Sequence, residues 1–328
     1  MGANCRSLAS PASAVFEVGG ISVQVSSHTD SAVELPSSLE PFRTEAEQAD
    51  ITMQVEWAPY LTELPDARVF DSGAIWRLYR ENFGYRFDFA APMFGDAPYK
   101  SLIIDEQFRQ GTLRLSHKAF DRLAGEIAPL DYPLDELLIM HRLTQEKGIE
   151  LHASGIVLGD GTGNLFVGHS GAGKSTTTRL WTTRDDVLVL SDDRIILRQT
   201  SPQHSSRSES EFQDCITSCG KTVDAEAGSR IFMYGTPWHG EAMYASPASA
   251  PLRRIFILEH GKGNVLTPLS SSQAIAELFA RSFVPFHRHN YVEASLEFLQ
   301  EIVDRVPVYR YAFEPDQRAV ATILNLHD

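Results

Sequence analysis

Hydrophobic and polar positions alternate over roughly the first 115 residues, and this two-residue period is typical of half-buried strands. VFEVGGISVQVSS shows the alternation on both sides of a Gly-Gly pair, which predicts a hairpin. Four more segments repeat the pattern between turn-like stretches of Pro, Gly and Asp: ITMQVEW, YRFDFAA, SLIIDE and GTLRLS. The pattern therefore predicts a β-rich N-terminal region. Its aromatic side chains fit either a core or the wall of a groove: Trp57, Trp76, Tyr79, Tyr85 and Phe87.

A helical period first appears in DYPLDELLIMHRLTQEKG, residues 131–148. Asp131 suits the N-cap and Pro133 suits the first turn. Four leucines fall on one face of this helix: Leu134, Leu137, Leu138 and Leu143. Gly148 is predicted to end it, and IELHASGIVLGD and GNLFVG then indicate two strands joined by a Gly-rich turn. We place a domain boundary near residue 120, between a β-rich domain at 1–120, a candidate for substrate recognition, and a second domain at 121–328.

The second half of the chain alternates strands with helices. A polar segment at 200–229, rich in Ser and acidic residues, is expected to be an exposed loop, either an insertion or a lid. After it we predict the strands RIFMY and LRRIFILE, the helices SSQAIAELFARSF and NYVEASLEFLQEIVDRV, the strand PVYRYAF and a helix from Pro315. This alternation predicts an α/β domain.

Composition and net charge argue against some classes of binding partner. The chain has 328 residues and a formal net charge of −14, which argues against nucleic acid and anionic membranes as partners. Its three cysteines are too few for a disulfide framework and lack zinc-site spacing. The N-terminus fits neither a signal peptide nor the myristoylation pattern, and no apolar run reaches the ~18 residues of a membrane span. We therefore expect a cytoplasmic protein.

The segment GHSGAGKS, residues 168–175, matches the phosphate-binding pattern G-x-x-x-x-G-K-[ST]. Glycines let the main chain curl so that successive N–H groups point at phosphate oxygens, and a following helix adds its N-terminal dipole. Lys174 is expected to reach the β- and γ-phosphates, and the Ser175 hydroxyl to bind Mg²⁺. A strand (NLFV) precedes the loop and a helix (STTTRLW) follows it. The pattern predicts an ATP site, with GTP as the alternative, formed by Gly168, Ser170, Gly171, Ala172, Gly173, Lys174, Ser175 and Thr176.

A second polar pattern follows one helix later, where the apolar strand VLVL ends in Ser191, Asp192 and Asp193. Such a strand end commonly supplies the carboxylate that holds the metal of a P-loop site. Adjacent side chains of a strand point to opposite faces, so the two carboxylates can have different tasks. We expect Asp192 to bind Mg²⁺ and Asp193 to accept a proton from an incoming hydroxyl. The alternative is that Asp193 is a turn residue or pairs with Arg194.

Other residues complete the candidate site. His152, on the strand before the P-loop strand, is either a core histidine or a residue that reaches the phosphates. The segment YGTPWHGE suits a rigid site wall, in which Trp238 covers a base or anchors the loop and Glu241 is a candidate metal ligand. One of Arg253 and Arg254 is expected to stabilise the transferred phosphoryl group, and we take Arg254. The predicted catalytic set is Asp193, His152, Lys174 and Arg254, and the metal set is Ser175, Asp192 and Glu241.

Three segments together resemble the HPr kinase/phosphorylase-like proteins, which share a fold with phosphoenolpyruvate carboxykinase: LHASGIVLGDGTGNLFVGHSGAGKST, LSDDR and GTPWHGE. The resemblance covers roughly residues 130–320. It implies that Asp193 is the base, that His152 belongs to the active site, and that Asp192 and Ser175 serve the metal. GTPWHGE stands where HPr kinases carry Glu-Ile-Arg-Gly and is similar to divergent HPr-kinase-related proteins. The resemblance thus implies phosphoryl transfer, and a homo-oligomer by analogy, without naming HPr as the acceptor.

The sequence therefore predicts an α/β protein with a P-loop kinase core and a β-rich N-terminal region. The expected function is an ATP-dependent, Mg²⁺-requiring kinase acting on a hydroxyl, foremost a serine of a protein or peptide. One alternative is a small-molecule kinase for a sugar or free serine. Another is a regulatory nucleotide-binding module with slow hydrolysis.

Overall fold

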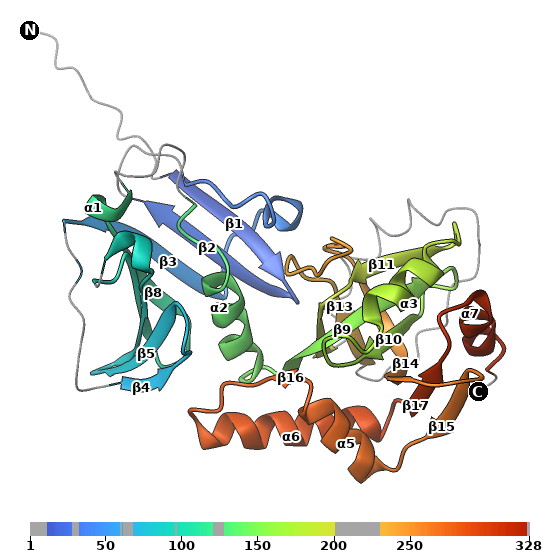
Figure 1. Cartoon of the computed structure of the whole chain (residues 1–328). Helices are drawn as coiled ribbons and strands as arrows, with labels where there is room; N and C mark the ends of the chain where they lie inside the picture. The colour runs from blue at the N-terminus through green and yellow to red at the C-terminus, as the bar shows by residue number, and fades with distance from the viewer. Residues whose placement is uncertain are drawn as a thin grey trace, which may run out of the picture. The chain divides into compact units, whose positions relative to one another are not determined.

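The computed structural model describes residues 12–27, 33–59, 61, 68–95, 97–120, 128–200 and 230–326. The fold is mixed α/β and rich in strands, with two large sheets and few helices. It forms two compact units, Met1–Leu138 and Ile139–Asp328 (Figure 1). The chain passes from one unit to the other inside α2 (Leu134–Leu143), whereas the sequence placed the boundary near residue 120. The predicted loop at 200–229 lies outside the described residues from position 201 onward.

The N-terminal unit contains an eight-stranded sheet in the order β1-β2-β3-β8-β7-β6-β5-β4. Its strands are β1 (Ala12–Val18), β2 (Ile21–Ser27), β3 (Ile51–Ala58), β4 (Arg68–Asp71), β5 (Trp76–Glu81), β6 (Gly84–Phe89), β7 (Lys100–Asp105) and β8 (Gln110–Ser116). Short helical turns lie at η1 (Glu40–Phe42), η2 (Pro92–Phe94) and α1 (His117–Phe120). The predicted β1–β2 hairpin is confirmed, and its Gly19 and Gly20 have φ of 62° and 70°, as its tight turn requires. Of the aromatic residues, Tyr79, Tyr85 and Phe87 are buried in the core.

Helix α2 contains the four leucines predicted to share a face, and all four are buried. The predicted helix end at Gly148 is wrong. The helix ends at Leu143, and the turn that follows includes Lys147, which takes the positive φ of 52°. Gly148 instead opens β9, where a Cβ atom would lie 2.6 Å from Cδ2 of Leu143. The glycine is needed for this close approach between helix and strand.

The C-terminal unit contains a nine-stranded sheet with the main path β10-β9-β12-β13-β14-β17-β15. β10 and β14 also pair in parallel, so the pairings β10–β9–β12–β13–β14 close on themselves. The strands are β9 (Gly148–Leu158), β10 (Gly163–Val167), β11 (Val187–Ser191), β12 (Arg194–Thr200), β13 (Arg230–Tyr234), β14 (Ser249–His260), β15 (Val265–Pro268), β16 (Ser282–Phe283) and β17 (Val308–Phe313). The helices are α3 (Lys174–Trp181), α5 (Ser271–Phe279), α6 (His289–Val303) and α7 (Gln317–Leu324).

Helices cover both faces of this sheet (Figure 1). Leu165 and Val167 of β10 pack in one apolar cluster with residues of α5 and α6, whereas Phe166 between them packs in another with residues of α3 and α7. This follows from the two-residue period of a strand, which sends successive side chains to opposite faces. Among the helices of the described residues, none has the length and apolar character needed to cross a bilayer.

β9 is an interior strand that pairs with four others. On one edge it pairs with β11 and β12, which run as one path interrupted only by Asp192 and Asp193. On the other edge it pairs with β16 and β10. β10 ends at Val167, and the N–H of the next residue, Gly168, donates to the carbonyl of His152 at 3.2 Å. His152 therefore has the loop after β10 on one side and the aspartate pair on the other.

Candidate functional site

The loop Gly168–Gly173 connects β10 to α3, so the predicted strand–loop–helix order is present. Gly171 and Gly173 have φ of 79° and 104°, values that L side chains rarely adopt. A Cβ atom on Gly173 would also lie 2.4 Å from the ring of Phe313, at the end of β17. On the loop's exposed side, Nε2 of His260 lies 2.8 Å from the carbonyl oxygen of Gly171. Contacts from β14 and β17 thus hold the curled loop, which has no room for a side chain at Gly173 and open space at Gly171.

Lys174 opens α3 and is buried, although it carries an ammonium group. Its Nζ lies 2.7 Å from Nε2 of His152 and donates to the carbonyl oxygens of Gly168 at 3.1 Å and His169 at 3.3 Å. Burial lowers the pKa of Lys174 to about 8, although the negative charges of Asp193 and Asp192 act in the opposite direction. Polar contacts therefore hold the Lys174 ammonium beneath the loop, where little water reaches it.

Asp193 lies beside the same histidine. Its Oδ1 is 2.9 Å from Nε2 of His152, and its Oδ2 forms an ion pair with Nη1 of Arg194. Burial acts to raise the pKa of Asp193, but the hydrogen bond to His152 and the positive charges of Arg194 and Lys174 outweigh it. The pKa of Asp193 therefore lies below its usual range. The pairing with Arg194 and the contact with His152 are present together.

His152 joins the lysine to the aspartate through a single ring nitrogen. Nε2 can accept a hydrogen bond from the Lys174 ammonium, or it can carry a proton and donate to Asp193, but it cannot satisfy both partners at once. Its side chain is 21% exposed, so it is not a fully buried core histidine. The structure therefore brings together three predicted residues, Lys174, His152 and Asp193. The proton at Nε2 of His152 can come from Lys174, or His152 can carry it and donate to Asp193.

Arg194 is held from the side away from Asp193. Its Nε lies 3.5 Å from Oε1 of Glu150, whose side chain is fully buried, and its guanidinium carbon lies 4.1 Å from the centre of the Phe283 ring. Sequence reasoning missed both residues. Glu150 and His152 are two positions apart on β9 and so share a face, which is the signal that could have found Glu150. Phe283 is far from Arg194 in the sequence, so no local pattern predicted the contact between them.

Asp192 has different partners from Asp193, and its carboxylate is buried. Oδ1 accepts hydrogen bonds from the N–H groups of Gly240 at 3.0 Å and Tyr244 at 3.2 Å, and Oδ2 accepts one from Ala242 at 2.8 Å. A carboxylate has about four acceptor positions, so three are already used by the main chain of this loop. In this structure Asp192 fastens the loop, and its metal role stays a prediction.

The remaining predicted metal residues are spread out. Glu241 is exposed, and Ser175 and Thr176 are half-buried in the first turn of α3. Within the described ranges, no three His, Cys, Asp or Glu side chains form a group that could hold a metal ion. Of the two roles weighed for Trp238, its burial favours anchoring the loop. Ser170 lies exposed on the P-loop.

The structure does not place Arg254 at the loop, and its catalytic role stays a prediction. Arg254 pairs with Asn164 on β10, four positions, or about 13 Å of strand, before the loop begins at Gly168. Its Nη2 donates to the carbonyl oxygen of Leu326 at 2.8 Å, near the C-terminus. Its neighbour Arg253 is half-buried and lies 3.3 Å from Asp160. Arg194, in contrast, lies beside Asp193.

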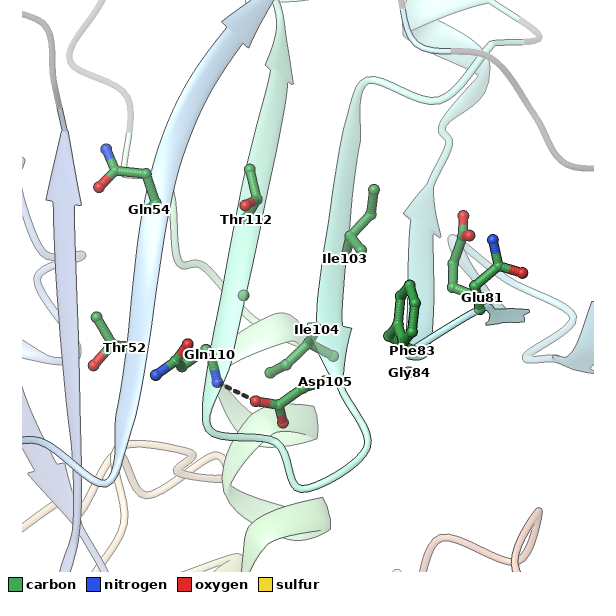
Figure 2. A pocket seen from close by; sticks show the side chains of 12 residues that line it. Thr52, Gln54, Glu81, Phe83, Gly84, Ile103, Ile104, Asp105, Gln110 and Thr112 are labelled. Carbon is green, nitrogen blue, oxygen red and sulfur yellow. Dashed lines mark hydrogen bonds between the residues drawn. The ribbon is translucent and has the colours of Figure 1, made fainter.

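A separate groove of about 490 Å³ lies in the N-terminal unit (Figure 2). It crosses β3, β8 and β7 and reaches the β5–β6 turn, where Phe83 is 90% exposed. Its lining combines polar side chains, such as Thr52, Gln54 and Thr112, with apolar ones, such as Ile103 and Ile104. The Asp105 carboxylate at its edge accepts hydrogen bonds from main-chain N–H groups of the β7–β8 turn. This lining lacks the lysine, histidine and aspartate arrangement of the P-loop site.

Comparison with known proteins assigns no family, because no protein-family model matches the chain and no curated protein is significantly similar to it.

Proposed function

We propose that the C-terminal unit is an ATP-dependent kinase that transfers the γ-phosphoryl group to a hydroxyl. The observation that carries the proposal is the contact of Lys174, at the end of a curled glycine loop, with His152 and through it with Asp193. The proposed phosphate-binding group and the proposed base both contact the same ring nitrogen of one histidine. The resemblance to HPr-kinase-related proteins supports the same chemistry.

The glycine loop and Lys174 hold the nucleotide in this proposal. The phosphates lie against the N–H groups of the loop, and Lys174 donates to the β- and γ-phosphate oxygens instead of to Gly168 and His169. Once Lys174 no longer donates to His152, Nε2 of that histidine is free to donate to Asp193. The low dielectric that lowers the pKa of Lys174 also strengthens its attraction for phosphate.

Asp193 acts as the base for the acceptor. The acceptor oxygen forms a bond to the γ-phosphorus, the bond from that phosphorus to the bridging oxygen breaks, and ADP leaves. The acceptor proton goes to Asp193, with His152 holding the carboxylate in place. A base of low pKa suffices, because phosphoryl transfer depends mainly on positioning and charge stabilisation.

Magnesium fits the first turn of α3. The Ser175 hydroxyl is half-buried next to Lys174 and makes no hydrogen bond within the described part of the chain. It would bind Mg²⁺ as a P-loop serine does, with phosphate oxygens and water as further ligands. Bound Mg²⁺ neutralises charge on the phosphates during transfer. The loop contacts leave Asp192 one acceptor position, and in this proposal Asp192 would bind the metal through that position.

The test measures labelled product directly. The full chain is incubated with Mg²⁺, γ-labelled ATP and cell extract separated into small and large molecules, and the assay is repeated with Asp193→Asn. We expect label in the large fraction, and a loss of about 10²-fold or more in the variant, the size of a lost base. The matched control is Asp186→Asn, because Asp186 forms an exposed ion pair with Arg184 outside the cluster.

The other outcomes separate the alternatives. Label only in the small fraction indicates a small-molecule kinase. Nucleotide binding with slow hydrolysis and no labelled acceptor in either fraction indicates a regulatory module and contradicts the kinase. Unlabelled GTP added in competition shows which nucleotide is preferred. Full activity of Asp193→Asn would remove the base assignment.

A further inference from the structure

The loop Thr236–Tyr244 is fastened against both aspartates of the candidate site. The Asp192 carboxylate holds it through three main-chain N–H groups, and the Thr236 hydroxyl donates to the carbonyl oxygen of Arg194 at 2.8 Å. A Cβ atom on Gly240 would lie 2.9 Å from Oδ2 of Asp192 and 3.3 Å from Cβ of Asp193. The 236–244 loop therefore lies against the chain segment that carries the residue proposed as base.

Met243 is an exposed apolar residue of this loop, whose other exposed residues, His239 and Glu241, are polar. Its side chain is 69% exposed, and its φ is +59°, a left-handed conformation that costs a methionine free energy. The residues on either side, Ala242 and Tyr244, both donate to Asp192, so the anchored loop imposes that conformation. The large apolar side chain of Met243 therefore faces solvent, and burial in a core does not explain why an apolar residue occupies this position.

We propose that the 236–244 loop binds the acceptor and that Met243 contacts an apolar residue next to the phosphorylated serine of a peptide segment. The inference rests on the proposed kinase function. A hydroxyl that reaches Asp193 arrives beside the chain segment to which this loop is fastened, because Gly240 leaves only 3.3 Å between an added Cβ and Cβ of Asp193. An exposed thioether side chain suits an apolar peptide side chain, since methionine adapts its shape to such partners, whereas a sugar would require hydrogen-bonding groups.

Asp192 has a corresponding task in this arrangement. It is a positioning residue, which holds the acceptor loop while its neighbour Asp193 accepts the proton. The two adjacent carboxylates then serve one acceptor in different ways.

The experiment measures which peptide acceptors the full chain phosphorylates most. An array of short peptides carries one central serine and no other hydroxyl side chain, and each flanking position is varied in turn. With γ-labelled ATP and Mg²⁺, we expect the wild-type chain to prefer apolar over charged residues at one flanking position by about tenfold or more. Met243→Lys should reverse the preference at that same position towards Glu and Asp. The control is Met93→Lys, because Met93 is 67% exposed in the N-terminal unit.

Each possible result either supports or overturns the proposal that Met243 contacts the acceptor peptide. A preference that is the same in wild type and Met243→Lys overturns it, and so does a wild-type chain that labels no peptide in the array. If label still appears on an acceptor in cell extract, the kinase proposal survives and only the acceptor loop is wrong. If no acceptor is labelled in extract either, the proposed function itself has failed.

Discussion

The Nζ atom of Lys174 lies 2.7 Å from Nε2 of His152, so the P-loop lysine and a histidine of the neighbouring strand contact each other directly. Main-chain pairing makes this contact possible, because the loop leaves β10 where Gly168 donates to the carbonyl of His152. The lysine is buried there, and its burial has a measurable effect on stability.

We predict that the free energy of unfolding rises with pH between about 8 and 9.5 through Lys174. Burial lowers the pKa of Lys174 to about 8 in the folded chain, against an ordinary value of 10.5. In this window the unfolded chain retains a proton that the folded chain has released, so raising the pH favours the folded state. The expected rise is about 1 kcal/mol, because each unit of pKa difference corresponds to about 1.4 kcal/mol and only part of the titration falls in the window.

Urea unfolding at several pH values checks this prediction. Lys174→Met should lack the rise, whereas Lys147→Met, at an exposed lysine paired with Glu301, should keep it. The scan stops at 9.5 because burial raises the pKa of Tyr99 to about 12, which lowers stability as the pH passes 10. An equal rise in the wild type and Lys174→Met would contradict the assignment.

A second prediction concerns the shape of the loop. Gly173→Ala should lower the free energy of unfolding by about 2–4 kcal/mol, since it combines left-handed strain with overlap against Phe313. Gly161→Ala is the matched control, because Gly161 has a φ of 80° and nothing lies within 4 Å of an added Cβ. It should cost about 1–2 kcal/mol. Urea unfolding gives both values, and equal losses would show that Phe313 does not confine the loop.

A third prediction separates two neighbouring arginines. Arg254→Met should lower the free energy of unfolding by about 1–3 kcal/mol, because it removes a buried charged hydrogen bond to the carbonyl of Leu326. Nucleotide affinity, measured by fluorescence titration, should change less than about threefold, or 0.65 kcal/mol. Arg253→Met, at a half-buried surface pair with Asp160, should cost less than about 1 kcal/mol. Loss of phosphoryl transfer in a stable Arg254→Met chain would support the catalytic role predicted from the sequence.

Short-range rules account for what the sequence predicted correctly. The strand, loop and helix around Gly168–Gly173 follow from residues within a few positions of one another. Asp192 and Asp193 do have different partners, but they lie in the bend between β11 and β12, where strand alternation does not apply. The β1–β2 hairpin follows from two adjacent glycines in an alternating segment. Strand β4 was missed because its four side chains are all exposed and leave no hydrophobic alternation.

Long-range pairings account for the rest. The donors to Asp192 come from residues 48 to 52 positions later in the chain, so no local pattern indicates them. The position of Arg254 has the same origin. A parallel pairing decides which part of β14 lies beside the loop, and Arg254 falls in the middle of that strand, opposite Asn164. Arg194 is next to Asp193 in the sequence, but its importance depends on Glu150 and Phe283, which only the folded sheet brings to it.

The position of β9 also limits how the chain can vary in length. His152 has the loop after β10 on one edge and the aspartate pair on the other, so both parts of the site depend on one register. Inserting or deleting one residue before His152 would turn its ring to the opposite face of the sheet. A related chain with this site should therefore keep the spacing from Glu150 to Val157 unchanged and take up differences in length in the turn between β9 and β10.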